Sequence, residues 1–148
     1  MISYTTCQTH MPDIKKRATN EWIKSVASLY HFKIGEIAYI FCNDEKILDV
    51  NKQYLQHDFY TDIITFDYSE NGIINGDIFI SLDTVKSNSE KYHSDYHTEL
   101  YRVIIHGILH LCGINDKLPG EREIMEAAEN AALAIRPSTI RTPLTSES

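Results

Sequence analysis

The stretch Leu100-Tyr-Arg-Val-Ile-Ile-His106-Gly-Ile-Leu-His110-Leu-Cys-Gly113-Ile-Asn-Asp116 decides how the rest of the chain is interpreted. Its first part is strongly apolar, which predicts a buried helix from about residue 95 to residue 112. His106 and His110 are four residues apart, so on a helix they lie on one face, about one turn from each other. Gly113 supplies a position at which a helix commonly ends and the chain reverses. That reversal could return Asp116 toward the histidines.

Two imidazoles in this relation can bind one metal ion, as in zinc sites of the HExxH type. With Asp116 as a third ligand, a tetrahedral ion keeps an open position for water, which is typical of catalytic sites. The alternative is a buried pair of histidines with satisfied hydrogen bonds. Burial of both rings without partners would cost several kcal/mol. The spacing favours the metal site over the buried pair, and it does not identify the metal.

Length and composition indicate one globular domain. The chain has 148 residues, of which 43% are hydrophobic and 24% charged, as in ordinary globular proteins. Its net charge of −7 argues against broad electrostatic binding to nucleic acid. A local basic surface is still compatible with that net charge. A short basic run could contact RNA, and it consists of Lys15, Lys16, Arg17 and Lys24. Such runs are more often solvated surface.

The cysteines and the N-terminus favour a cytoplasmic protein. Cys7, Cys42 and Cys112 are far apart and form no CxxC motif, which is typical of reduced thiols. No stretch is apolar for long enough to span a bilayer, and the first residues lack the pattern of a signal peptide. We therefore expect no membrane association.

Hydrophobic periodicity and turn signals predict an α+β fold in one domain, with a small mixed β-sheet packed with helices and the histidine-bearing helix buried. The expected strands are 2–7 (an edge strand), 36–42, 61–68 and 77–81, the last two paired antiparallel. The expected helices are 13–30, 43–55, 81–92, 95–112 and 121–135. In the last helix an apolar stripe is expected at Ile124, Ala127, Ala128, Ala131 and Leu133. The domain is expected to cover 1–136, followed by a flexible C-terminal tail, 137–148.

Three blocks of sequence resemble the YbeY family of metal-dependent endoribonucleases. His106-Gly-x-Leu-His110-Leu-x-Gly113 resembles most of that family's H-G-x-L-H-L-x-G-x-D-H signature. Asn51-Lys-Gln-Tyr54, then Asp58 and Thr61-Asp62-Ile-Ile-Thr-Phe66, resemble its N-x-x-Y-R-x-x-D-x-P-T-D-V-L-S-F block. Gly76-Asp77-Ile-Phe-Ile-Ser81 resembles its G-D-I-x-I-S strand. The blocks keep their order over roughly residues 43 to 116.

Two positions depart from the family pattern. The family's third histidine ligand falls on Asp116, and the preceding aspartate falls on Asn115. Aspartate is a competent zinc ligand, so the site can survive with a harder donor set. The family's arginine after the tyrosine falls on Leu55, where an arginine would suit a phosphate contact.

The resemblance implies an endoribonuclease specific for single strands, which acts in 16S rRNA 3′-end maturation and ribosome biogenesis. It implies one Zn²⁺ per chain, bound by His106, His110 and Asp116, and RNA partners: rRNA, the 30S subunit or its proteins. The nucleophile could be the zinc-activated water or the 2′-hydroxyl of RNA. Gly107 stands where a zinc peptidase has its catalytic glutamate, which disfavours peptide hydrolysis.

Outside the metal motif, Thr61 and Asp62 are the candidate catalytic residues of the pocket. A capped turn leading into a strand is the structural alternative for both, and Asp77 carries the same ambiguity. His57, His93 and His97 lie in polar neighbourhoods and are expected at the surface. Two other functions stay open at this point: a non-catalytic ribosome-assembly factor with a structural metal, and a metallohydrolase of another substrate.

Overall fold

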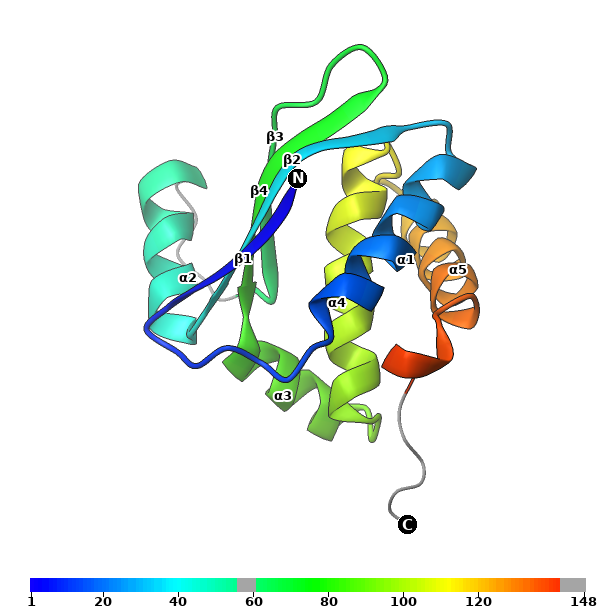
Figure 1. The fold of residues 1–148 in the computed structure, drawn as a ribbon. Coiled ribbons are helices and arrows are strands. Elements are labelled where there is room, and N and C mark those ends of the chain that lie inside the picture. Colours follow the sequence, from blue (N-terminus) through cyan, green and yellow to red (C-terminus); the bar gives the residue numbers. More distant parts are fainter. Residues whose placement is uncertain (56–60, 142–148) are drawn as a thin grey trace.

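Strands of one mixed sheet lie at the centre of the molecule, with helices on both of its faces (Figure 1). This computed structural model describes residues 1–55, with only the backbone of Leu55, and residues 61–141. Within these residues the sheet has four strands in the order β1-β2-β4-β3. Their bounds are Ile2–Cys7 for β1, Lys33–Cys42 for β2, Ile63–Asp67 for β3 and Ile73–Ser81 for β4. The predicted α+β class, with a mixed sheet and a buried central helix, is confirmed.

The sheet is parallel except at one edge. β1 pairs with β2 and β2 with β4 in parallel, whereas β3 pairs with β4 in the antiparallel sense. The predicted edge strand at the N-terminus and the predicted antiparallel pair are therefore confirmed. β4 begins at Ile73, earlier than expected, because the connecting turn closes by hydrogen bonds between Glu70 and Ile73.

The helices divide into two layers around the sheet. α1 (Lys16–Leu29), α4 (Tyr96–Leu111) and α5 (Glu121–Ala134) lie on one side, and α2 (Asp44–Val50) covers the other (Figure 1). α2 continues into a short π-helical turn, Asn51–Leu55, and α3 (Leu82–Lys91) follows β4 directly. Asn43 caps α2 as expected, because its side chain accepts a hydrogen bond from the Lys46 amide.

α4 is the most buried helix, and it carries the candidate site. Asp95 caps its first turn by accepting a hydrogen bond from the Thr98 amide at 3.0 Å. Gly107 faces the sheet so closely that a Cβ there would lie 3.0 Å from Ile78 and 3.3 Å from Ile63. A residue without a side chain at this position therefore lets α4 approach β3 and β4, and this approach fixes the height of His106 above the sheet.

Two further details differ from the expectations. The predicted stripe of α5 is confirmed only in part: Leu133 is buried and Ala128 packs against the core, whereas Ile124 is 61% exposed and Ala127 and Ala131 are exposed. Met125, Glu129 and Ala132 are buried instead. The face of α5 that packs against the core is therefore rotated by about one residue from the predicted face. The sequence does not reveal this rotation, because the helix is rich in alanine. Of the expected tail, residues 137–141 are described: Ser138–Ile140 form a 3₁₀ turn, and Ile140 packs into the core. Residues 142–148 lie outside the described part of the chain.

Candidate metal centre at the α4–α5 contact

One side of α4 is polar, although the helix is otherwise apolar. Arg102, His106 and His110 follow one another at intervals of four residues, so they share this side, and all three are half-buried. The expected common face of the two histidines is therefore confirmed.

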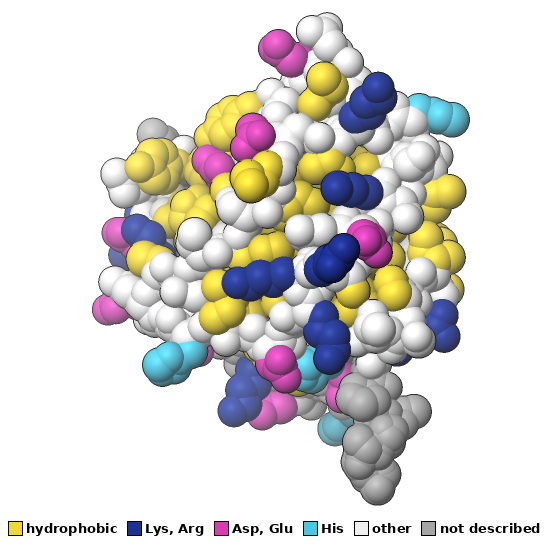
Figure 2. All heavy atoms as spheres, viewed as in Figure 1, with side chains coloured by type: hydrophobic (Ala, Val, Ile, Leu, Met, Phe, Trp, Pro, Cys, Tyr) yellow, Lys and Arg dark blue, Asp and Glu magenta, His cyan; other side chains and the backbone are white. Residues whose placement is uncertain are grey.

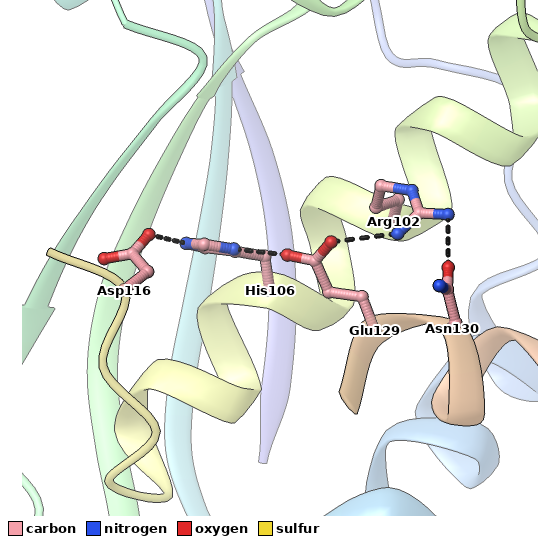
Figure 3. Close-up of polar contacts among 5 residues, drawn as sticks. All are labelled: Arg102, His106, Asp116, Glu129 and Asn130. Carbon is pink, nitrogen blue, oxygen red and sulfur yellow. Dashed lines mark hydrogen bonds and ion pairs between the residues drawn. The ribbon is translucent and has the colours of Figure 1, made fainter. Parts of the chain in front are cut away.

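The turn after α4 returns Asp116 to this polar side. Gly113 adopts φ +97°, a left-handed conformation that glycine accepts without strain. The amides of Gly113 and Ile114 donate to the carbonyls of His110 and Leu109, which closes the end of the helix. As a result, Oδ2 of Asp116 lies 3.4 Å from Nε2 of His106 (Figure 3). The expected return of Asp116 is observed.

Glu129 of α5 contacts the other ring nitrogen of His106, and the sequence analysis did not identify it. Its Oε2 lies 2.7 Å from Nδ1 of His106, and its Oε1 accepts a hydrogen bond from Nη1 of Arg102 at 2.9 Å (Figure 3). Nη2 of Arg102 donates to Oδ1 of Asn130 at 2.7 Å. The sequence did hold one signal: Glu129 lies four residues after Met125 and three before Ala132, so the three share a face of the helix. The predicted stripe placed the buried face elsewhere.

The charges of this cluster shift the pKa values of its members. For His106, burial alone would lower the pKa, but the hydrogen bond with Glu129 and the charges of Glu129, Asp116 and Asp62 outweigh it, so the pKa is raised. For Glu129, burial alone would raise the pKa, but the hydrogen bonds from His106 and Arg102 outweigh it, so the pKa is lowered. The contact therefore behaves as an ion pair in the metal-free chain.

Asp62 belongs to the same electrostatic cluster, whereas Thr61 has a local role. Burial raises the pKa of Asp62, the charge of His106 opposes this, and Glu129 and Asp116 add to it. The hydroxyl of Thr61 donates to the Ile63 carbonyl at 3.4 Å, and the Asp62 carbonyl accepts from the Ser81 amide. These backbone contacts fit the turn that leads into β3.

His110 is not joined to this network. Among residues 1–55 and 61–141 its ring makes no hydrogen bond or ion pair. Within the same residues, no group of three or more His, Cys, Asp or Glu side chains is arranged to hold a metal ion. The structure therefore brings His106 and Asp116 together, and the set of His106, His110 and Asp116 stays a prediction.

The contact between His106 and Asp116 nevertheless fits zinc. Nitrogen and oxygen ligands lie about 2.0–2.2 Å from Zn²⁺, so at the tetrahedral angle two of them are about 3.4 Å apart. The observed separation of Nε2 and Oδ2 is 3.4 Å. Imidazole and carboxylate also form a donor set that zinc accepts.

The remaining candidates lie away from this network. Asp77 accepts a hydrogen bond from the Tyr68 hydroxyl at 3.3 Å, on β4. His93 is exposed and His97 half-buried, whereas His57 and Asp58 lie outside the described residues. The basic run on and before α1 is exposed, as expected for a solvated surface, and Figure 2 shows that face with several Lys and Arg side chains across its middle.

Comparisons with known proteins identify the family. A family model described as "Endoribonuclease YbeY" matches residues 4–135. The chain belongs to this family. Proteins named Endoribonuclease YbeY from Bacteroides fragilis and Phocaeicola vulgatus are 71% and 70% identical over 135 residues, covering 91% of this chain and 97% and 98% of theirs.

YbeY membership confirms the resemblance read from the three sequence blocks, and with it the enzyme class, a nuclease of the hydrolases. A protein of Thermotoga maritima with a known solution structure has the same fold, with a TM-score of 0.64 at 21% identity, over 98% of this chain and 99% of that one. In the described part of the chain, no helix has the length and apolar content needed to cross a bilayer.

Proposed function

We propose that this YbeY-family chain is a metal-dependent endoribonuclease that cleaves single-stranded RNA. Its place is the cytoplasm, where it acts in 16S rRNA 3′-end maturation and ribosome biogenesis. It holds one Zn²⁺ through His106, His110 and Asp116, and it meets its rRNA substrate on the 30S subunit or with the help of 30S proteins. Family membership supports the nuclease activity, and the positions of the chain's own residues support the bound metal.

The main observation in favour of a bound metal is the distance of 3.4 Å between Nε2 of His106, on a buried helix, and Oδ2 of Asp116. His110 stands one turn further along the same side of α4 and is the candidate for a third donor.

Charge is the second support for a bound cation. The pKa values of Asp62, Glu99 and Glu129 are shifted from their ordinary values, and nearby charges contribute to each shift, among them Arg102, His106 and the Asp116 carboxylate. Such an excess of carboxylates would repel the phosphodiester of RNA. His106 and Asp116 would hold a divalent cation that offsets this charge; when bound, such an ion would supply polarisation of a phosphate oxygen and an activated water.

Asp62 is the candidate for proton transfer. Burial raises the pKa of its carboxyl group, so Asp62 holds a proton up to a higher pH than an exposed aspartate would. Thr61 holds the turn before β3 through its hydrogen bond to the Ile63 carbonyl. Its role in the reaction is therefore to place Asp62.

Metal content and RNA cleavage, measured on the same preparations, test the proposal. The wild-type chain is purified without added metal beside Asp116→Ala and His106→Ala, with the exposed Asp13→Ala and His10→Ala as controls. We expect about one zinc per wild-type chain and per control chain, with a sharp reduction in both site variants. Cleavage of an end-labelled single-stranded RNA should fall by at least about a hundredfold in the site variants, and a duplex of the same sequence should stay intact.

Two outcomes would contradict the proposal. Undiminished cleavage in His106→Ala would show that the proposed metal takes no part in the reaction. Absence of zinc from every preparation, even after zinc is offered, would reduce His106 and Asp116 to an ion pair. The rRNA role is tested separately in cells: 16S rRNA with an extended 3′ end should accumulate when Asp116→Ala replaces the wild-type chain.

A further inference from the structure

The carboxylate of Glu129 lies between two side chains of α4. Its Oε2 contacts Nδ1 of His106 at 2.7 Å, and its Oε1 contacts Nη1 of Arg102 at 2.9 Å. Arg102 is fixed in turn by Asn130, whose Oδ1 lies 2.7 Å from Nη2. Figure 3 shows these residues joined by successive contacts, from Asp116 through His106 and Glu129 to Arg102 and Asn130.

We propose that Glu129 is a positioning residue, which holds the His106 ring with its proton on Nδ1 and its Nε2 directed at Asp116. Arg102 and Asn130 keep the carboxylate of Glu129 in place. The proposal rests on the metal site of the proposed function, and it adds which nitrogen of His106 binds the ion and which residue decides this.

Hydrogen-bond chemistry assigns the proton. An ionised carboxylate only accepts hydrogen bonds, so a ring nitrogen at 2.7 Å from Oε2 must donate. A neutral imidazole carries one N–H, and with that proton on Nδ1 the lone pair lies on Nε2. Nε2 is the nitrogen that faces Asp116, at the longer distance of 3.4 Å. The two contacts of one ring therefore differ in kind: a close hydrogen bond on one side and a gap that fits an ion on the other.

The burial of Glu129 argues against an incidental contact. The residue is 8% exposed and lies on the core-facing side of α5, between Met125 and Ala132. A carboxylate is expensive to bury unless its oxygens are paired, and here both oxygens are used. Apolar packing alone does not require a carboxylate at this core-facing position, whereas the contacts with His106 and Arg102 do.

Carboxylates that accept the second N–H of a metal-binding histidine fix its ring and raise its basicity, and their loss typically weakens metal binding about 10–100-fold. Glu129→Ala removes the acceptor, and Glu129→Gln keeps an acceptor oxygen without the charge. Glu126→Ala is the matched control, because Glu126 is exposed on the same helix. The comparison of Gln with the wild type isolates the charge of Glu129, and the comparison of Ala with Gln measures the loss of the acceptor together with the side-chain volume.

The first measurement is the tautomer of His106 in the metal-free chain, read from the ¹⁵N shifts of its ring by NMR at a pH above its titration. We expect the Nδ1–H form in the wild type, in Glu126→Ala and in Glu129→Gln. Glu129→Ala should give a mixture of both tautomers. A wild-type ring that carries its proton on Nε2, or an unchanged ring in Glu129→Ala, overturns the proposal.

The second measurement is zinc affinity, by competition with a chelator of known affinity, on variants shown by circular dichroism to be folded. We expect the dissociation constant to rise about 10–100-fold in Glu129→Ala and clearly less in Glu129→Gln. An unchanged constant in folded Glu129→Ala refutes the positioning role even if the nuclease works through zinc. Conversely, a wild-type chain that binds no zinc refutes the proposed metal site, and the NMR result then still decides whether Glu129 orients His106.

Discussion

The two sides of α4 are held in place by different kinds of interaction. Toward the sheet, Gly107 lies almost against Ile78, and Leu111 lies 3.2 Å from the position that a Cβ would take at Gly76. Toward α5, Arg102 and His106 share the carboxylate of Glu129. The first side is held by apolar packing, which depends little on pH, and the second by charges and hydrogen bonds, which depend on it strongly. Packing therefore fixes where α4 lies, and the polar contacts fix how the His106 ring is turned.

The largest effect should come from the apolar side. Ile104 is fully buried one turn before Gly107, so Ile104→Ala should lower the free energy of unfolding by roughly 2–5 kcal/mol. The loss should be the same at pH 5.5 and at pH 8, because no titratable group is removed. Urea unfolding at both values measures it. A loss that differs between them by more than a third would show that the two sides of α4 are coupled.

Arg102→Ala should have a smaller effect on stability, about 1–2 kcal/mol, because it leaves Oε1 of Glu129 and Oδ1 of Asn130 without their donor. The side chain is 28% exposed, so water replaces part of the lost contacts. Arg122→Ala, at an exposed position of α5, is the control and should change stability by less than about 0.5 kcal/mol. Equal losses in both variants would remove Arg102 from the support of Glu129.

Gly107→Ala measures how tightly α4 meets the sheet. The new methyl group would meet Ile78 at 3.0 Å, and overpacking of this kind costs about 1–3 kcal/mol. Alanine also favours the helix by about 1 kcal/mol, so the net loss should be about 1 kcal/mol. Thermal unfolding of the metal-free chain gives the value. A stabilised variant would mean that the ends of Ile78 and Ile63 move aside freely.

The smallest effect is a pH dependence on the polar side. Because the pKa of His106 is raised, its contribution is present below its ordinary value of 6.5 and is lost as pH rises through the raised value. Because the pKa of Glu129 is lowered, its contribution is present above 4.5 and is lost as pH falls through the lowered value. The stability difference between wild type and Glu129→Gln, both metal-free, should therefore be largest between pH 4.5 and 6.5, as urea titrations across this range will show. A difference that does not vary with pH would show that the contact carries no charge.

Much of the fold could be predicted because its signals are local. Helix 95–112 was predicted within one residue at each end, since a long apolar run bounded by Asp95 and Gly113 has few alternatives. The return of Asp116 was predicted from Gly113 alone, because a left-handed residue at the end of a helix reverses the chain. β4 was predicted too short, because the Asn71–Gly72 and Asn75–Gly76 pairs both suggest turns and only the first forms one.

Glu129 could not be predicted, because its role depends on tertiary structure. Nothing near it in the sequence shows that α5 packs beside the polar side of α4, and its distance along the chain from His106 gives no periodic signal. The apolar stripe of α5 was misplaced in part for a related reason: five of the 14 residues of this helix are alanines, which are tolerated on either face of a helix. The partner of a buried polar group is fixed by helix packing, and a single sequence does not contain that information in readable form.

Trp22 gives the molecule a built-in optical probe. It is the only tryptophan of the chain and is 1% exposed, and its indole N–H donates to the carbonyl of Ala132 at 2.9 Å. Its ring also meets Tyr101 edge to face, 5.8 Å between centroids. One fluorophore thus touches α1, α4 and α5 together. Its emission should shift to longer wavelength whenever α5 leaves α4, so separation of the helix that carries Glu129 can be followed in real time without a label.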